Sequence, residues 1–589
     1  MPFSLIIILL ALDMIRFAAK RIDIIENSWE LDYDLCLNVY STLAQLSIRF
    51  LSCHDEALDA AMRVCQHAKT LEDKIRAQII LIRHKVEGSN RDYKGGVEYI
   101  RNILLDYGLK FPRRIIPGRQ YIENRKLMGR LEGNVEVFLN LPKLNDRNVS
   151  EIRTQNIIKL LAYLVQYSAY NKKLKGLHRY GTTQILNLSI NEGSSSDTPM
   201  AIVNFGANLL RKGRKEDATK WFNVARELIE FFPRKIGSRH STVHSFLTFA
   251  FLSKTEPLHK TLDPILELNR LSLRNGDMIN AYMAWIGYAY AYISVGLPLV
   301  PLDSDMMSFS NEARQFGPPP TIMVLFPIFR QSIYNLRVLQ LNPTLLKGDI
   351  FDQEKELKKF EGNGLMMTLR DVNSFRLMLA CIFQDWEAAD ELISALEPFL
   401  YSITWFLRRH FYLVYMGYAS VVLGKKANVT KRQKYRQLGK KIIKIFRKLL
   451  KDGSSDALPV IMMLEAIKYP SKKRFDEAIR ASARLGLVHY TAMINENAGL
   501  FFLECDKMSR AKHYLSEASK LYGEWGASGK MKHMIEKYDG LNLSSKQHFR
   551  GSNIHGRTRF SSEHLSQLRK PINLSLIDSA NKSEEKDQL

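Results

Sequence analysis

The chain has 589 residues, of which 46% are hydrophobic and 25% are charged, an ordinary composition for a soluble protein with a large core. Its net charge of +24, from 85 basic and 61 acidic residues, favours anionic partners such as nucleic acid, acidic proteins or a membrane surface. It has only 32 Gly and 19 Pro residues, and long stretches repeat apolar residues with a helical period. These features favour an all-α protein and argue against a β-sandwich or an α/β sheet.

The cysteines and histidines predict no metal site. Five cysteines, without a CxxC pair, favour unpaired thiols in a reducing compartment, and we expect a cytoplasmic protein. Cys53 and His54 lie near Cys65 and His67 in the sequence, but a zinc site needs four well-placed donors, so buried helical cysteines are the better interpretation. His240 and His244 lie four residues apart but lack the glutamate of an HExxH motif.

Residues 1–13 are apolar and end at Asp13, well short of the roughly 20 apolar residues that a membrane-spanning helix needs. They also lack the basic start and the small-residue cleavage site of a secretory signal. We therefore expect no transmembrane span. We interpret residues 1–13 as an apolar segment in which Met1 lies inside, or replaces, the true upstream sequence, which would make it a gene-model artefact.

The chain continues as a series of predicted helix pairs. Residues 30–51 place apolar side chains on one helix face, and Asp55 begins the next helix with acidic residues at its positive end. Similar acid-then-alanine starts recur at Asp385 and Asp476. The 39 residues between the equivalent positions Ala57 and Gly96 fall within the range of helix-pair repeats.

Residues 475–538 show the repeated unit most clearly. A first helix ends near Gly486, where a glycine is typical after a helix, and a second spans about 490–504. A third helix ends at Trp525-Gly526, and a fourth covers 527–538. In the second helix we predict this buried set: Ala498, Leu500, Phe501 and Leu503.

These residues resemble a known family. Phe475-Asp-Glu-Ala-Ile, Gly486-Leu-Val-His and the run AKHYLSEASKLYGEWGASGK (511–530), followed by MKHMIEKY, look like the end of the tetratricopeptide-like region of large AAA/STAND-type signalling ATPases. Other stretches fit the same region in the same order, so the resemblance covers most of residues 14–540; they are 28–109, 213–231, 275–299 and 383–400. In that family, kinase-like and P-loop ATPase domains often precede this region, and GAF and histidine-kinase domains often follow it.

The expected fold is a TPR-like α-α superhelix, a right-handed helical-repeat solenoid with two lobes. We predict a first lobe at 14–295 and a second at 321–540, joined by a Pro- and Gly-containing joint at 296–320. Residues 541–589 are rich in Ser, Asn, Lys and Glu with little hydrophobic period, which predicts a disordered polar tail.

A helix near residues 281–292 alternates alanines with aromatic residues, among them Trp285, Tyr288 and Tyr290. An RNA-binding aromatic stripe is one interpretation. An interlocking core is the better one, because small residues beside aromatic ones suit closely packed helix pairs.

No catalytic motif is present in the sequence. A phosphate-binding P-loop requires GxxxxGK[ST], and Gly424-Lys425, Gly439-Lys440 and Gly529-Lys530 lack both the upstream glycine and the following Ser or Thr. Kinase, histidine-kinase and GxSxG motifs are missing as well. We therefore assign no catalytic, cofactor-binding or metal-binding residue and no cofactor, and predict that the chain is not an enzyme.

One basic segment is a candidate site for an anionic partner. Residues 425–451 contain no acidic residue, and Ile442, Ile445, Phe446 and Leu449 form one apolar stripe. The stripe either packs on the next helix pair or docks on an anionic membrane or an acidic partner. The candidate patch consists of the surrounding basic residues: Lys440, Lys441, Lys444, Arg447, Lys448 and Lys451.

The leading hypothesis is a non-catalytic helical-repeat scaffold for protein–protein interaction or regulation in signalling, related to the region that follows the ATPase domain in the family above. One alternative is a fragment of an ATPase or kinase whose catalytic domains lie outside this chain. Another is a basic nucleic-acid-binding helical repeat, against which the irregular repeat spacing argues.

Overall fold

The computed structural model of the chain describes residues 3–48, 53–87, 92–110, 117–145, 148–169, 174–234, 239–315, 318, 320–400, 406–541 and 543. Every regular element within these ranges is a helix, and their β-structure is limited to two isolated bridges, Lys143–Ser194 and Lys347–Asp352. The structure therefore confirms the predicted all-α class.

The helices of the first half are α1 (Phe3–Ile22), α2 (Ser28–Leu31), α3 (Tyr33–Ser47), α4 (His54–His67), α5 (Leu71–Glu87), α6 (Tyr93–Asp106), α7 (Pro117–Leu131), α8 (Val137–Asn140), α9 (Val149–Ser168), α10 (Lys175–Glu192), α11 (Thr198–Arg211), α12 (Lys215–Glu230), α13 (His240–Phe246), the π-helix η3 (Leu247–Leu252), α14 (Ser253–Thr255), the 3₁₀ helix η4 (Leu258–Thr261) and α15 (Leu262–Arg274).

The helices of the second half are α16 (Met278–Val295), α17 (Leu299–Arg314), α18 (Pro320–Met323), α19 (Leu325–Arg337), α20 (Gln353–Glu356), α21 (Gly362–Phe383), α22 (Trp386–Leu396), α23 (Phe406–Lys426), α24 (Val429–Lys451), α25 (Ala457–Lys468), α26 (Lys472–Arg484), α27 (Val488–Glu504), α28 (Met508–Trp525) and α29 (Ser528–Lys537), with short 3₁₀ helices at Leu357–Lys359, Glu397–Phe399 and Asp539–Leu541.

Neighbouring helices pack against each other in pairs, as a helical-repeat solenoid requires. Such pairs include α3 with α4, α11 with α12, α15 with α16, α23 with α24, and α27 with α28. Small residues permit the close approach: a Cβ added to Gly499 of α27 would lie only 2.6 Å from Cγ of Leu515 on α28. The predicted α-solenoid is thus present, built from sequential helix pairs.

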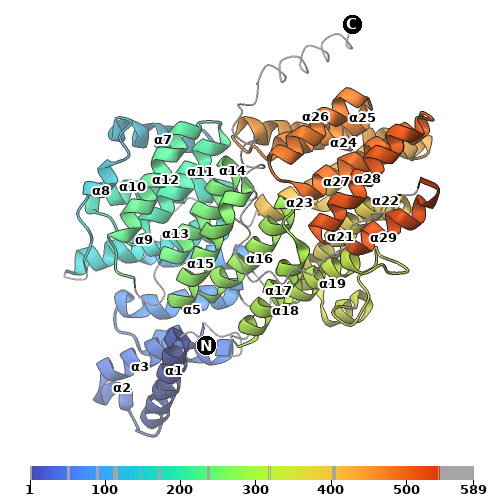
Figure 1. Ribbon diagram of the computed structural model, residues 1–589. Helices are drawn as coiled ribbons and strands as arrows, with labels where there is room; N and C mark the ends of the chain where they lie inside the picture. The colour runs from blue at the N-terminus through green and yellow to red at the C-terminus, as the bar shows by residue number, and fades with distance from the viewer. Residues whose placement is uncertain are drawn as a thin grey trace.

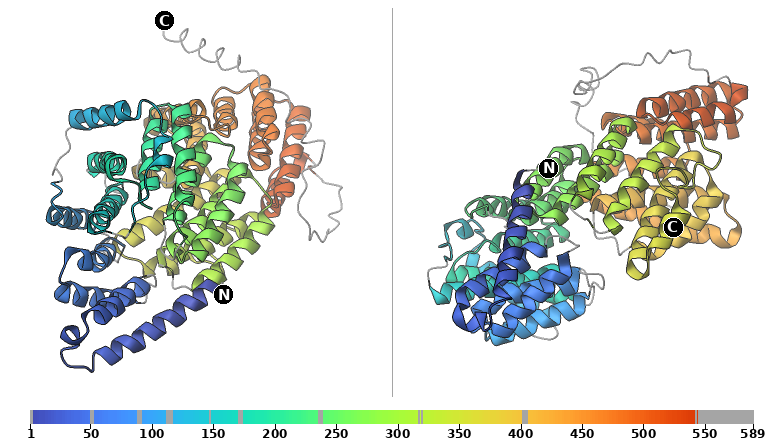
Figure 2. Two further views of the ribbon diagram at one scale, coloured as in Figure 1. Left: turned by 90° about the vertical axis from the view of Figure 1, so that its left-hand side faces the viewer. Right: turned by 90° about the horizontal axis from the view of Figure 1, so that it is seen from below.

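The helices bury two hydrophobic cores. One core contains residues from Ile75 to Phe251, and the other joins residues 12–80 to residues 258–543. In Figure 1 the helices α7–α13 and α21–α29 form two groups with α16 and α17 between them, and the views of Figure 2 agree. The predicted lobe boundaries, 14–295 and 321–540, stay a prediction, and α1 runs continuously through the boundary drawn at residue 13.

Helix α16 is the buried aromatic helix that the sequence analysis singled out. Trp285 is 1% exposed and Tyr290 is fully buried. The Tyr290 ring lies 4.9 Å from that of Phe329, 5.8 Å from that of Phe375 and 5.5 Å from that of Phe411, so it contacts three later helices. The core interpretation of this helix is confirmed, and its aromatic rings do not form an exposed stripe.

The predicted joint at 296–320 is mostly helical. Gly296 ends α16 in the left-handed region, with φ of 76°, and Pro298 stands immediately before α17. Leu299, Leu302 and Met306 of α17 are fully buried, so this segment packs into the core. Residues 316, 317 and 319, within the predicted Gly-Pro break, lie outside the described residues.

We expect Gly296→Ala to lower the free energy of unfolding by about 2–3 kcal/mol, because left-handed backbone disfavours a side chain and the added atom overpacks the site. A Cβ at Gly296 would lie 2.1 Å from Nδ1 of His489. The matched control is Gly213→Ala, with φ of 80° and open space around it, which should lose only about 1 kcal/mol. Equal shifts of the thermal midpoint in both variants would contradict this account.

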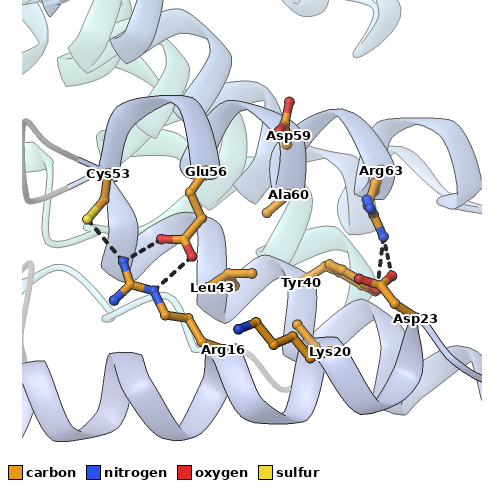
Figure 3. Close-up of a pocket in the computed structure, with 11 residues that line it drawn as sticks. Arg16, Lys20, Asp23, Tyr40, Leu43, Cys53, Glu56, Asp59, Ala60 and Arg63 are labelled. Carbon is orange, nitrogen blue, oxygen red and sulfur yellow. Dashed lines mark hydrogen bonds and ion pairs between the residues drawn. The ribbon is translucent and has the colours of Figure 1, made fainter.

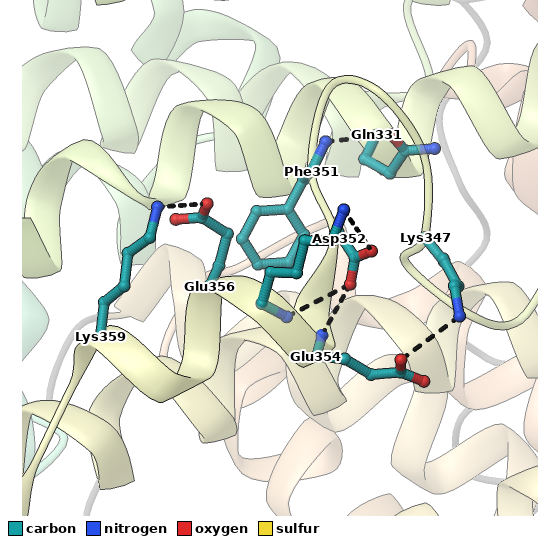
Figure 4. A network of polar contacts seen from close by, with 8 residues as sticks. Gln331, Lys347, Phe351, Asp352, Glu354, Glu356 and Lys359 are labelled. Atoms are coloured by element: carbon teal, nitrogen blue, oxygen red, sulfur yellow. Dashed lines mark hydrogen bonds and ion pairs between the residues drawn. The ribbon is translucent and has the colours of Figure 1, made fainter.

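The loop between α19 and α21 is held by the buried side chains of Gln331 and Asn335, and Figure 4 shows the contact of Gln331 with Phe351. The backbone N–H of Phe351 donates to Oε1 of Gln331 at 3.2 Å, and Nε2 of Gln331 donates to Oδ1 of Asn335 at 2.8 Å. Nδ2 of Asn335 donates in turn to the carbonyls of Pro343 and Leu345, at 3.0 and 2.7 Å. Because these groups satisfy one another away from water, the loop is a fixed part of the fold.

The C-terminal helix pairs agree closely with the prediction. The third and fourth predicted helices correspond to α28 and α29, and Gly526 caps α28 in the left-handed region with φ of 92°. One detail is wrong: Phe502 is buried with Ala498, whereas Leu500, Phe501 and Leu503 are only partly buried. The buried arc is displaced because α27 packs on α25, α26 and α28 together.

In the described ranges no helix combines the length and the apolar character needed to cross a bilayer. The predicted disordered tail, 541–589, lies outside the described residues except for its first positions, Leu541 and Leu543.

Candidate interaction surfaces

Helix α24 carries the basic patch that the sequence predicts. Asn428 caps its N-terminus, where the side-chain Oδ1 accepts a hydrogen bond from the backbone N–H of Lys431 at 3.2 Å. Gly439 lets the helix approach α23 closely, since a Cβ there would lie 3.2 Å from Cγ2 of Val421. The helix thereby packs along α23 on one side and α25 on the other.

The apolar stripe of α24 faces the core. Ile442 and Phe446 are fully buried and Ile443 is 5% exposed, while Ile445 and Leu449 are only partly buried. The centre of the stripe is therefore shifted by about one residue from the predicted one, because two helices cover α24 instead of one. The stripe packs within the fold and does not face solvent.

The basic residues of the patch divide into two kinds. Lys440, Lys441, Lys444, Lys448 and Lys451 are exposed, and we refer to these five as the basic face. Arg447 is half-buried and donates a hydrogen bond to Oε1 of Glu465 on α25 at 2.8 Å. Arg447 therefore ties α24 to α25 and lies at the edge of the basic face.

Ion pairs neutralise some of the lysines of α24 and leave others without a counter-charge. Lys431 pairs with Asp390 at 2.6 Å and Lys434 with Glu397 at 2.8 Å. Within the described part of the chain, Lys440, Lys444 and Lys451 have no ion-pair partner. These three lysines consequently present uncompensated positive charge on the helix.

The neighbouring helices add to the positive electrostatic potential around α24. Residues 425–484 hold 18 basic and five acidic residues, so a tenth of the chain carries +13 of its net charge of +24. Nearly all of these residues belong to α24, α25 and α26, which lie together in Figure 1. Such a concentration raises the local density of anions and the rate at which an acidic partner associates.

A pocket of about 620 Å³ lies between α1, α3 and α4 (Figure 3). Arg16 of α1 donates two hydrogen bonds of 2.8 Å to the carboxylate of Glu56 on α4, and a third to Sγ of Cys53 at 3.1 Å. Farther along, Asp23 pairs with Arg63 and accepts a hydrogen bond from the Tyr40 hydroxyl at 2.6 Å.

The polar groups of this pocket mainly join helices. The guanidinium of Arg16, together with the hydroxyl of Ser47, lowers the pKa of Glu56, although partial burial opposes the shift. Two ion pairs, one at each end, connect α1 to α4 across the pocket. We therefore assign this pocket a structural role in attaching α1.

The side chains weighed as metal ligands do not converge. His67 stacks on the Trp29 ring at 4.7 Å, and Sγ of Cys53 accepts a hydrogen bond from Arg16. Among the described residues no group of three or more His, Cys, Asp or Glu side chains is placed to hold a metal ion. His240 is buried, which lowers its pKa, while Nε2 of His244 lies 3.3 Å from Oε1 of Glu230.

A second hollow, a groove between α26 and α28, was not predicted from the sequence. Its residues come from three helices that are separated by turns. The groove residues of α26 or of α28, taken alone, have the pattern of an ordinary solvated helix face. Helical spacing of Lys472, Asp476 and Arg480 was the available signal, but only the pairing of helices makes a groove from it.

Comparisons with known proteins add little. No family model matches the chain, and no curated protein matches it. Among solved structures, a "circular tandem repeat protein with novel repeat topology and enhanced subunit contact surfaces" aligns over 91% of this chain and 96% of that chain, at 12% identity and a TM-score of 0.13. The fold is assigned from the helices and their packing.

Proposed function

We propose that this chain is a non-catalytic helical-repeat scaffold that binds an acidic partner protein through the basic face of α24. The observation that carries this proposal is a row of exposed lysines on a helix whose apolar side is already buried. Lys440, Lys444 and Lys448 recur every four residues, about one helical turn apart, and so form a row on one side of the helix.

A protein partner fits this surface better than a membrane. An amphipathic helix that binds in the membrane interface inserts an apolar face, and in α24 that face packs on α23 and α25. Only charge remains available at the surface. Complementary charge on a partner gives specificity and fast association without requiring an exposed apolar patch.

We also propose a regulatory role in signalling and a cytoplasmic location for the chain. The resemblance of residues 14–540 to AAA/STAND-type ATPases supports a regulatory role beside an ATPase or kinase, and nothing in the described residues favours the alternative of a catalytic fragment. None of the five cysteines is in a disulfide, which supports a reducing compartment such as the cytoplasm.

The test is charge reversal on the basic face. We expect the variant Lys440→Glu, Lys444→Glu, Lys448→Glu to bind fluorescent polyglutamate at least about tenfold more weakly than the wild type at low salt. Because the lysines are exposed, the difference should shrink as salt screens the charges. Fluorescence anisotropy measures both effects, and thermal unfolding checks that the fold is retained.

The matched control is Lys159→Glu, Lys212→Glu, Lys220→Glu, which makes the same change in net charge at exposed positions of another surface. It should bind polyglutamate as the wild type does. Equal weakening in both variants would refute a specific basic face. Flotation with phosphatidylserine vesicles and a duplex DNA titration complete the test, and lysine-dependent binding to either of these without binding to polyglutamate would also contradict the proposal.

A further inference from the structure

A groove of about 630 Å³ runs between α26 and α28. Helix α27 packs against both neighbours and forms its floor, since α26 and α28 are each paired with α27. The groove therefore follows directly from the packing of the helices: α27 also packs on α25, and its side between α26 and α28 is the bottom of a channel.

Three helices supply the lining at helical spacing, so the side chains on each one point the same way. Thr491 and Asn495 of α27 are buried in the floor, and Nδ2 of Asn495 donates to the Thr491 carbonyl at 2.8 Å. The polar walls consist of Lys472, Asp476 and Arg480 on α26 and of Arg510, His513 and Glu517 on α28.

One acidic group of the groove is already satisfied. Asp476 accepts hydrogen bonds from Nζ of Lys472 at 2.7 Å and from the Tyr514 hydroxyl at 2.6 Å. The second bond crosses from α28 to α26 and fixes the width of the groove at its middle. Lys472 and Asp476 therefore neutralise each other and leave the other charges to decide what binds.

The remaining walls are predominantly basic. Arg480 and Arg510 are exposed, and in the part of the chain that the structure describes neither has an ion-pair partner. The guanidinium of Arg510 lies 5.7 Å from the centre of the Phe502 ring, which restricts its position. Counting whole helices, α26 and α28 hold eight basic and four acidic residues.

We propose that this groove binds an extended acidic segment of a partner protein, with its carboxylates on Arg480 and Arg510. Arginine forms two parallel hydrogen bonds to a carboxylate, so a guanidinium on each wall suits successive acidic side chains of one segment. Ile479 and Leu521, which also line the groove, provide apolar contact between the charged positions. Glu517 disfavours carboxylates at its own position and so restricts where the segment lies.

This groove is separate from the basic face of α24, and the two proposals stand or fall on different residues. Arg480→Ala with Arg510→Ala is expected to weaken binding of fluorescein-labelled hexaglutamate about tenfold at physiological salt. The matched control is Arg484→Ala with Lys512→Ala. It also removes two positive charges from exposed positions of the same two helices, but outside the groove.

Anisotropy titrations of the full chain read out the result, and hexaglutamine serves as the uncharged peptide. The expected pattern is weak binding by the groove variant and wild-type binding by its control. The triple glutamate variant of α24 should bind the short peptide within about twofold of the wild type, because salt screens distant charge. Failure of the wild type to bind hexaglutamate, equal affinities of the groove variant and its control, or equal affinity for hexaglutamine would each overturn the proposal.

Discussion

Replacing Lys530 by methionine is expected to destabilise the chain by about 3–5 kcal/mol, because it leaves the Glu496 carboxylate buried without its counter-ion. Nζ of Lys530 lies 2.7 Å from Oε1 of Glu496, and the two side chains are 0% and 2% exposed. The Tyr522 hydroxyl donates to the other carboxylate oxygen at 2.9 Å. One hydrogen bond from tyrosine would remain to balance a full buried charge.

The loss should begin at α29, which attaches the C-terminal repeat to the middle of the chain. Oγ of Ser528 donates to the Arg337 carbonyl at 2.7 Å, and a Cβ at Gly529 would lie 2.7 Å from the Val338 carbonyl carbon, so the end of α19 and α29 touch. Differential scanning calorimetry measures the shift in thermal midpoint. Hydrogen exchange should be faster in α29 than in distant helices of the variant.

Two further variants isolate the ion pair. Lys532→Met removes an exposed lysine from the same helix and should change stability by no more than about 0.5 kcal/mol. The double variant Lys530→Met, Glu496→Met removes both charges and should recover most of the loss, since a buried pair is readily replaced by apolar groups. An equal loss in the single and double variants would show that packing, and not the unpaired charge, controls stability here.

Mild acid should destabilise the chain through its buried histidines. Burial lowers the pKa of His178 and of His410 to about 4, and that of His489 to about 3, from 6.5 in the unfolded chain. Between these values the unfolded state binds more protons than the folded state, so the free energy of unfolding is highest above pH 6.5 and falls as the pH drops towards 4. At pH 5 each of these histidines lowers the free energy of unfolding by about 2 kcal/mol.

One buried carboxyl acts in the opposite direction. Asp456 accepts a hydrogen bond from the backbone N–H of Leu258 at 2.8 Å, and its burial raises its pKa to about 6. Its protonation between pH 7 and pH 5 raises the free energy of unfolding by about 1 kcal/mol. Together, these three histidines and Asp456 are therefore expected to lower the free energy of unfolding by about 5 kcal/mol over this interval.

Denaturant unfolding at pH 7 and pH 5 measures the difference. In the variant His410→Gln, His489→Gln the loss on acidification should shrink by about 4 kcal/mol, whatever the effect of the substitutions at pH 7. A double variant with the wild-type pH dependence would mean that other groups control acid sensitivity.

Local pattern was sufficient to predict much of the fold. The ends of α26 and α28 were predicted from Gly486 and Gly526, both of which have positive φ. Burial of α16 was predicted from alanines beside aromatic residues. In each case the signal lies within a single helix, where spacing decides which side chains share a face.

Features that join distant segments could not be predicted in this way. The contact between Asp456 and Leu258 spans 198 residues, and nothing near either residue indicates the other. Gly529-Lys530 lacks the rest of a phosphate-binding motif, and its position gives no sign that the lysine is fully buried on Glu496. The groove between α26 and α28 could not be predicted for the same reason, since its walls belong to separate helices and only their packing brings them together.

The candidate basic face was predicted from sequence in its composition but not in its details. Five of the six residues are exposed, whereas Arg447 lies at the contact with α25, because α24 is covered on two sides. The spacing of apolar residues predicts how wide the buried arc of a helix is, but only if a single neighbouring helix covers it. A second neighbouring helix widens that arc and partly buries the flanking Arg447.

The most direct test of the central claim is lysine acetylation footprinting of the intact chain, read by mass spectrometry with and without saturating polyglutamate. Without the polymer, Lys440, Lys444 and Lys448 should react rapidly and Lys530, which is fully buried, should react only on unfolding. With the polymer at low salt, we predict strong protection of the basic face and unchanged rates at Lys159, Lys212 and Lys220. Unchanged reactivity of Lys440, Lys444 and Lys448 at saturation would contradict the claim that this face binds acidic partners.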